Sequence, residues 1–174
     1  MNILKRHIAD VDTIRLIEKV VESFSNTKSG KGLPLGNLTS QLLVNVYMNE
    51  FDQYVKHTLK IKYYIRYADD FVVLSHDREY VENILEKMKC YLETVLCLSL
   101  HPNKVFIKTV SSGLDFLGWV HFPDHRVLRT STKRRMLRNI KEKNGKKETV
   151  QSYLGLLKHG NTMKLRDKIK PFIG

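Results

Sequence analysis

The sequence predicts an α+β protein of 174 residues whose C-terminal part is helical and basic. Three observations support this prediction. Apolar residues recur at helical spacing in several segments, most clearly in Val81–Val95. Two short apolar runs, Ile61–Tyr67 and Phe71–Ser75, flank a tight acidic connection, which is typical of a β-hairpin. The net charge of +12 lies entirely beyond residue 100.

The first predicted helix carries apolar residues at helical spacing from Ile14 to Phe24. Asp10 or Asp12 can cap its N-terminus, because a carboxylate can accept hydrogen bonds from the free amides of the first turn. The polar segment Ser25–Gly32 is predicted to be a connector.

A second helix is predicted from its N-cap Asn37 to about Thr58. Its expected inward residues are Leu38, Leu42, Val46, Phe51 and Val55. The hairpin follows, with Ala68-Asp69-Asp70 as its connection. A third helix then begins after Asp77 and has an amphipathic stripe. That stripe comprises Val81, Ile84, Leu85, Met88, Tyr91, Leu92 and Val95.

Pro102 is predicted to precede a strand at about Lys104–Thr109. A second hairpin is expected over Leu114–Thr130, with its turn near Pro123-Asp124-His125. Helices complete the chain, separated by stops at Asn144-Gly145 and His159-Gly160-Asn161. Their expected ranges are about Thr132–Lys143, Glu148–Lys158 and Met163–Lys170.

The distribution of charge predicts a polyanionic partner. Residues 1–100 hold 13 basic and 13 acidic side chains, whereas residues 101–174 hold 17 basic and 5 acidic ones. Nucleic acid is the favoured partner, because each phosphate that a basic side chain neutralises releases condensed counterions. An anionic membrane, an acidic protein and a basic surface that only keeps the protein soluble are the alternatives.

Composition excludes several classes of protein. A hydrophobic content of 42%, with only 9 glycines and 4 prolines, excludes wholesale disorder. No run of 18 apolar residues predicts a membrane span, and the N-terminal residues do not resemble a signal peptide. Cys90 and Cys97 suit a reducing compartment and cannot form a disulfide scaffold or a metal cluster. We therefore expect a cytoplasmic protein without membrane contact.

Asp69 and Asp70 are the candidate metal ligands. Adjacent carboxylates repel each other, and a divalent cation relieves this repulsion. Oxygen ligands suit Mg²⁺, with Mn²⁺ as an alternative. The other interpretation is a solvent-exposed acidic turn, because aspartate is a good turn residue.

Five motifs in order resemble those of reverse transcriptases, over nearly the whole chain. Tyr67-Ala68-Asp69-Asp70 is similar to the Tyr-x-Asp-Asp signature of that family. Gly32–Gln41 resembles the template and nucleotide loop, and Leu98–Lys104 resembles the lysine-bearing segment that follows the palm helix. Phe116–Trp119 resembles the primer grip, and Ser152–Asn161 resembles the start of the later thumb helices.

Two positions indicate a subtype. Group II intron reverse transcriptases usually carry Gln and Pro where this chain has Leu35 and Gln41. The form found here resembles the enzymes of diversity-generating retroelements, which copy a template RNA with errors at adenines. An apolar Leu35 removes a polar side chain that would monitor the incoming nucleotide.

The resemblance implies an incomplete polymerase palm, with a ferredoxin-like antiparallel sheet covered by helices on one face, followed by a small basic thumb. The expected divisions are a partial palm over residues 1–110, a primer-grip-like hairpin over 111–131 and a helical thumb over 132–174. The family's first palm strand, which carries an essential aspartate, and its fingers are expected to be absent.

The resemblance also implies roles for particular residues. Asp69 and Asp70 would be catalytic and bind Mg²⁺ or Mn²⁺. The residues expected to contact nucleotide or template are Leu35, Gly36, Gln41, Tyr67 and Lys104. Those expected to contact primer or duplex are Phe116, Gly118, Trp119, Arg134, Arg138 and Lys141. The last three fall at i, i+4 and i+7 on one helix face. Some of these residues have a simpler interpretation. The aromatic residues Tyr67, Phe116 and Trp119 can be packed residues, and Lys104, Arg134, Arg138 and Lys141 can be charges on a solvated surface.

The predicted function is therefore that of an RNA-directed DNA polymerase, working by two-metal nucleotidyl transfer on an RNA template and a DNA primer, with deoxynucleoside triphosphates. The resemblance further implies a small basic accessory protein. The isolated chain is expected to be inactive, because Asp10, Asp12, Glu50 and Asp52 do not replace the first-strand aspartate convincingly. It is also expected to self-associate. The alternatives are a non-catalytic nucleic-acid-binding module and a structural remnant that needs its N-terminal half.

Overall fold

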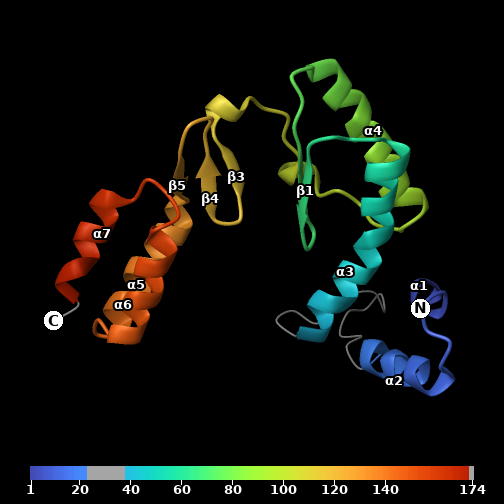
Figure 1. Cartoon of the computed structure of the whole chain (residues 1–174), viewed down its shortest axis with the longest axis horizontal. Helices are drawn as coiled ribbons and strands as arrows, with labels where there is room; N and C mark the ends of the chain where they lie inside the picture. Colours follow the sequence, from blue (N-terminus) through green and yellow to red (C-terminus); the bar gives the residue numbers. More distant parts are fainter. Residues whose placement is uncertain (23–37, 173–174) are drawn as a thin grey trace. The chain divides into compact units, whose positions relative to one another are not determined.

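The computed structural model describes residues 1–22 and 38–172. The chain divides into two compact units, Met1–Val105 and Phe106–Gly174. Both contain helices and a small antiparallel sheet, so the α+β prediction is confirmed for the described residues (Figure 1). No helix in these ranges is long and apolar enough to cross a membrane.

The first unit contains helices α1 (Asn2–Lys5), α2 (Val11–Glu22), α3 (Leu38–Gln53) and α4 (Arg78–Thr94), with strands β1 (Tyr64–Tyr67) and β2 (Asp70–Val73). A π-helical turn, η1 (Tyr54–Thr58), continues α3, so the second helical segment ends where the sequence predicts. The predicted hairpin is confirmed, because β1 and β2 pair antiparallel.

Two aspartates cap helices in this unit. The backbone amide of Thr13 donates to Asp10 Oδ2 at 2.7 Å, so Asp10 rather than Asp12 caps α2. The Tyr80 amide donates to Asp77 Oδ1 at 3.1 Å, which confirms the predicted start of α4. Each cap satisfies an amide that the first helical turn would otherwise leave unpaired.

The core of the first unit lies between the second half of α3, the hairpin and α4. Figure 1 shows β1 running beside α3 and α4. The fully or nearly fully buried residues are Met48, Phe51, Val55, Ile61, Ile84, Met88, Leu92 and Leu96.

Two expectations about inward residues are wrong. Leu38 and Leu42 are 81% and 64% exposed, because the cluster that packs on α3 begins only at Val44. Val95 is exposed while Leu96 is buried, because α4 ends at Thr94 and the chain turns there. Helical periodicity no longer applies beyond that end.

The predicted strand at Lys104–Thr109 is also wrong. Pro102–Lys104 forms a short 3₁₀ helix, η2, and the following five residues form no ladder. His101 Nδ1 accepts from the Asn103 amide at 3.2 Å and caps this turn. A strand needs a backbone partner, and none of the described strands pairs with this segment.

The second unit begins with a short 3₁₀ helix, η3 (Val110–Ser112), and a three-stranded antiparallel sheet instead of one hairpin. Its strands are β3 (Leu114–Phe116), β4 (Trp119–His121) and β5 (Arg126–Leu128). The extra turn arises at Leu117 and Gly118, whose φ angles of 52° and 81° match a two-residue type I′ turn. The predicted turn near Pro123–His125 joins β4 to β5.

The three predicted C-terminal helices are confirmed as α5 (Thr130–Glu142), α6 (Lys147–Leu157) and α7 (Met163–Ile169), followed by the 3₁₀ turn η4 (Lys170–Phe172). Asn144 and Gly145 both have positive φ angles at the predicted stop after α5. Trp119, Leu128 and the inward faces of the helices share one core. Its remaining members are Met136, Ile140, Val150, Leu157, Leu165 and Ile169.

Candidate functional site

The tip of the first-unit hairpin places the aspartate pair. Tyr67 pairs with Asp70, so the loop contains only Ala68 and Asp69, and Asp70 is already the first residue of β2. Ala68 has a φ angle of 52°, whereas Asp69 does not have a positive φ. A positive φ at the first loop residue alone is a feature of type II′ turns, which suit the twist of hairpin strands.

Both aspartate side chains at this tip are exposed. Within the described part of the chain, neither carboxylate is hydrogen-bonded or ion-paired. Tyr67 lies on the same face of the hairpin as Asp70 and is 60% exposed. Two free carboxylates on neighbouring residues suit a hard cation such as Mg²⁺, which keeps several waters and takes one or two carboxylates from the protein.

No group of three or more metal-ligating side chains gathers anywhere in residues 1–22 and 38–172. The other acidic residues considered in this unit have partners of their own. Asp10 caps α2, and the Glu50 carboxylate lies 3.2 Å from Arg6. Asp52 is ion-paired to Arg66. Asp69 and Asp70 are therefore the carboxylates that fit a cation at the hairpin.

Arg66 on β1 is the residue near this tip that the sequence analysis missed. Its Nε donates to Asp52 Oδ1 at 2.8 Å, and its Nη2 donates to Asp52 Oδ2 at 2.6 Å. Its Nη1 donates to the Ala68 carbonyl at 2.7 Å and to Asn45 Oδ1 at 3.2 Å. One guanidinium thus joins two positions on α3 to the loop. The signal in the sequence was a charged residue two positions after Tyr64, on the face of β1 that is partly buried.

The surroundings of this ion pair favour its charged form. Partial burial of Asp52 opposes ionisation, but hydrogen bonds from Arg66 and Tyr64 outweigh it, so the pKa of Asp52 lies below its usual value. The hydrogen bond to Asp52 raises the pKa of Arg66. Burial, followed by the hydrogen bond to Asp52, raises the pKa of Tyr64, whose hydroxyl donates to Asp52 Oδ1 at 2.7 Å.

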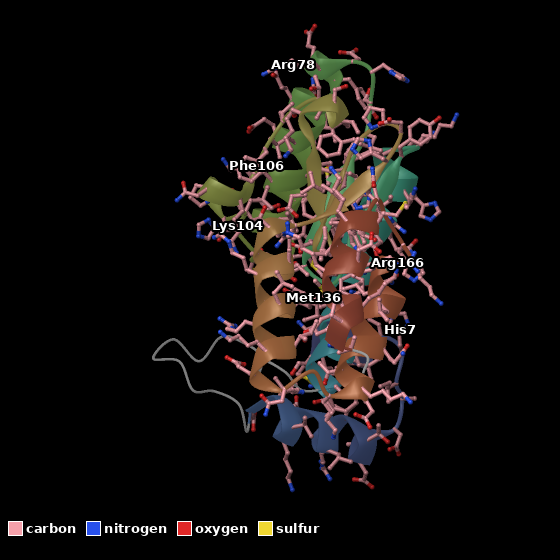
Figure 2. All side chains as sticks on the ribbon, turned by 90° about the vertical axis from the view of Figure 1, so that its left-hand side faces the viewer. His7, Arg78, Lys104, Phe106, Met136 and Arg166 are labelled. Atoms are coloured by element: carbon pink, nitrogen blue, oxygen red, sulfur yellow. The ribbon has the colours of Figure 1, made fainter. Side chains whose placement is uncertain are left out.

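Only some of the residues expected to contact nucleotide or template lie in the part of the chain that the structure describes. Leu35 and Gly36 lie outside the described residues. Gln41 is exposed on the second turn of α3. Lys104 is exposed at the end of η2 and lies at the surface in Figure 2. No hydrogen bond or ion pair joins Gln41 or Lys104 to the aspartate pair.

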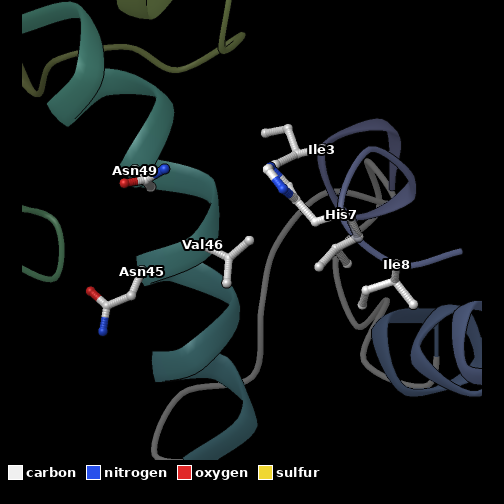
Figure 3. Close-up of a pocket in the computed structure, with 7 residues that line it drawn as sticks. Ile3, His7, Ile8, Asn45, Val46 and Asn49 are labelled. Atoms are coloured by element: carbon white, nitrogen blue, oxygen red, sulfur yellow. The ribbon is translucent and has the colours of Figure 1, made fainter.

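A shallow groove of about 460 Å³ separates α1 from α3. Figure 3 shows Ile3 and His7 on one side of it and Val46 on the other. The lining is mainly apolar. Asn45 connects the groove to the hairpin, because its side chain also accepts from Arg66.

The residues expected to contact the primer lie in the β-sheet of the second unit. Trp119 is 6% exposed and belongs to the unit's core, while the Arg126 guanidinium lies 5.2 Å from the centre of its ring. Phe116 is half-buried, and Gly118 occupies the β3–β4 turn. The burial of Trp119 agrees with its interpretation as a packed aromatic residue. Contact with the primer stays a prediction for Phe116, Gly118 and Trp119.

Helix α5 presents a basic face. Arg134, Arg138 and Lys141 are exposed, and Met136 and Ile140 are buried on the opposite side. Figure 2 labels Met136 on this helix. Arg138 makes one weak exposed ion pair, at 3.8 Å from Glu142. Cations spaced along one exposed helix face can follow a phosphate backbone without reading its sequence.

An α+β unit with an aspartate pair at a hairpin tip, in one chain with a basic helical unit, is compatible with a fragment of a nucleic-acid polymerase. Residues 4–121 match the model of the family described as reverse transcriptase (RNA-dependent DNA polymerase). The chain belongs to this family.

Curated relatives agree with this assignment. The chain is 29% identical over 166 residues to protein YkfC of Escherichia coli K12, covering 74% of the chain and 42% of the relative. It is 23% identical over 240 residues to the group II intron-encoded protein LtrA of Lactococcus lactis subsp. cremoris, covering 99% of the chain and 38% of the relative. The chain thus spans about two fifths of the length of these relatives.

Proposed function

We propose that this chain is part of an RNA-directed DNA polymerase that copies an RNA template into complementary DNA. The observation that carries the proposal is the family match over residues 4–121, which includes the hairpin with the exposed Asp69 and Asp70 at its tip. The basic second unit adds support, because the substrates of such an enzyme are polyanions.

In this proposal Asp69 binds Mg²⁺ or Mn²⁺ and Asp70 helps to hold the ions. When bound, the ions polarise the phosphoryl group and lower the cost of the charge that develops during transfer. The exposed Tyr67 supports the 3′ end of the primer, and Gln41 and Lys104 contact the template or the nucleoside triphosphate. Leu35 and Gly36 complete that contact.

The two units take the roles of palm and thumb. The first unit contains the palm hairpin with α3 and α4, and the second contains the primer grip, with Phe116, Gly118 and Trp119, and the thumb. Arg134, Arg138 and Lys141 on α5 follow the backbone of the duplex. Their exposure and their alignment opposite a buried face support this role.

The 174 residues on their own do not catalyse extension in this proposal. Two-metal transfer needs carboxylates that hold both ions roughly 3.5–4 Å apart, and no third ligand lies beside the pair in the described residues. A further carboxylate from another segment or polypeptide then completes the site. The greater length of the relatives is consistent with this view.

The template belongs to a retroelement, and the diversity-generating type is the favoured subtype. Leu35 and Gln41 carry this part of the proposal. A small basic accessory protein accompanies the complete enzyme.

The test measures extension of a DNA primer on an RNA template with Mg²⁺ and all four deoxynucleoside triphosphates. We expect that the 174-residue chain makes no extension product. In a separate measurement, we expect Mn²⁺ to broaden the amide resonances of Asp69 and Asp70, and Asp69→Ala to weaken this broadening. Extension that Asp69→Ala abolishes would show that the chain's own site is complete. Absence of Mn²⁺ broadening would favour the alternative, a non-catalytic nucleic-acid-binding module or a remnant that needs complementation.

A further inference from the structure

Arg66 occupies an unusual position among the charged residues of the first unit. Its side chain is only 10% exposed, and its partner Asp52 is 28% exposed. Both oxygens of Asp52 accept from the guanidinium, and the same oxygen that accepts from Nε also accepts from the Tyr64 hydroxyl. This two-point contact fixes the plane of the guanidinium, which a single contact would leave free to rotate.

The fixed plane directs Nη1 toward the loop. Nη1 donates to the carbonyl oxygen of Ala68 at 2.7 Å. That carbonyl belongs to the peptide group that links Ala68 to Asp69. Because a peptide group is planar, holding its oxygen also restricts the orientation of the Asp69 amide and of the backbone that carries the Asp69 side chain.

The loop needs such support because Ala68 has a φ angle of 52°. A left-handed conformation is unfavourable for a residue with a β-carbon, and it persists only where surrounding contacts hold it. A two-residue loop at the end of a two-stranded sheet has few contacts of its own. The hydrogen bond from Arg66 supplies one such contact, because it joins the Ala68 carbonyl to a side chain that is itself bound to α3.

Helix α3 supplies the rigid base. Asn45 and Asp52 lie seven residues apart, two turns along one face of α3, and both accept hydrogen bonds from Arg66. The neighbouring residues Met48, Phe51 and Val55 anchor that part of the helix in the core. A strain-bearing loop is thereby tied to a helix instead of depending on its own two residues.

We propose that Arg66, held by Asp52 and Asn45, is a positioning residue that orients the Ala68–Asp69 peptide so that the Asp69 carboxylate is presented to a divalent cation. This inference rests on the proposed function, because it assigns Asp69 to metal binding. Arg66 itself does not touch the cation. Lysine cannot replace it, because one ammonium group cannot contact both Asp52 oxygens, Asn45 and Ala68 in this planar arrangement.

The test uses the full chain labelled with ¹⁵N and compares Arg66→Lys with wild type. The first readout is the order parameter of the Ala68 and Asp69 amides without metal. We expect about 0.85 in wild type and less than about 0.6 in the variant. The second is the Mn²⁺ concentration that broadens the Asp69 and Asp70 resonances, which we expect to rise roughly tenfold.

The matched control is Arg78→Lys, which makes the same substitution in an exposed ion pair with Glu82 on α4. It should change neither readout. Amide exchange in the buried part of α4, around Met88, shows whether each variant keeps its fold. Where Arg66→Lys lowers that protection, Asp52→Asn is the second variant, because it keeps the size of the partner and removes one acceptor and the charge.

The outcomes separate this inference from the proposed function. Wild-type chain that shows no Mn²⁺ broadening at Asp69 contradicts the proposed function, whereas the order parameters still test the positioning. Unchanged order parameters in both folded variants would overturn the inference. So would an equal loss of protection in α4 and the loop in both variants, because Arg66 would then act only on global stability. Loss of loop order with α4 protection retained supports it.

Discussion

Gly160 packs against the indole ring of Trp119 so closely that a β-carbon at Gly160 would lie 2.2 Å from Trp119 Cζ3. The same atom would lie 2.9 Å from the Arg126 carbonyl oxygen. The Asn161 amide donates to that oxygen at 2.8 Å, and Arg126 Nε donates to the His159 carbonyl. The segment between α6 and α7 thus packs on Trp119 of β4 and is hydrogen-bonded to Arg126 of β5, and these contacts leave no room for a side chain at Gly160.

Gly160→Ala should therefore destabilise the second unit. Neither the ring nor the backbone carbonyl can move without disturbing the core, so we expect a loss of about 1–3 kcal/mol. Trp119 is the chain's single tryptophan, so its fluorescence during urea unfolding reports on this unit. Gly155→Ala is the control, because nothing lies within 4 Å of a β-carbon there. In helix α6 alanine should instead stabilise, by up to about 1 kcal/mol. Equal midpoints for the two variants would contradict the packing argument.

Asp52→Asn should make the stability of the hairpin less dependent on pH in the acidic range. The pKa of Asp52 in the folded chain lies below its ordinary value of 3.8. Folding therefore favours the ionised form, and this contribution is present above about pH 4 and lost as the pH falls through the folded pKa. The midpoint of urea unfolding, followed by the amide resonances of Phe71 and Val73, should fall more steeply in wild type than in the variant between about pH 5 and pH 2.

The variant should also be less stable than wild type near neutral pH, because it loses the charge that pairs with Arg66. Asp10 and Asp124, whose pKa values are also lowered by hydrogen bonds, remain in both proteins. The difference between the two pH profiles therefore isolates Asp52. Parallel profiles would show that the ion pair does not contribute to the stability of the hairpin.

Binding of an RNA–DNA duplex should be independent of sequence and steeply dependent on salt. If about four phosphates are contacted, log K should fall against log salt concentration with a slope of roughly −3 to −4. Changing Arg134, Arg138 and Lys141 together to Ala should reduce the slope to about −1, because three of the four contacts are lost. Titrations at several salt concentrations measure this.

The control for charge alone changes Arg78, Lys87 and Lys89 of α4 to Ala. These three side chains are also exposed, and replacing them with Ala also removes three positive charges. We expect them to leave the slope nearly unchanged. A similar reduction in both triple variants would indicate that net charge, and not the α5 face, governs binding.

The chain should self-associate through its first-unit hairpin. In the described residues β1 and β2 pair only with each other, so each strand has one edge without a partner. Tyr63, Ile65 and Tyr67 are exposed on one face of this hairpin. Open edges next to an exposed apolar face favour pairing with another chain. Sedimentation at micromolar concentration should show species larger than a monomer.

Ile65→Lys should shift this equilibrium toward monomer, because it places a charge on the exposed face without removing a core residue. Leu16→Lys on α2 is the matched control, since Leu16 is also exposed and lies away from the hairpin sheet. A wild-type monomer with full amide-exchange protection from Phe71 to Leu74 would rule out self-association by this route.

The sequence determined the features that depend on residues within a few positions of each other. Helical periodicity located α4 and the C-terminal helices, and Asp77 marked the start of α4 because a cap acts over three residues. The two apolar runs and the acidic connection indicated the hairpin, and the Tyr67–Asp70 motif indicated the family. Local pattern was sufficient for each of these.

The tertiary structure decided what depends on distant segments. Arg66 reaches Asp52 across 14 residues, and no spacing rule identifies that pair. Trp119 is buried by helices and a loop that follow it in the chain, so its aromatic side chain alone could not distinguish a primer contact from a core position. Leu38 and Leu42 continue a helical stripe, yet nothing described covers them. Periodicity states which face of an element is apolar, whereas burial also requires that another part of the chain pack against that face.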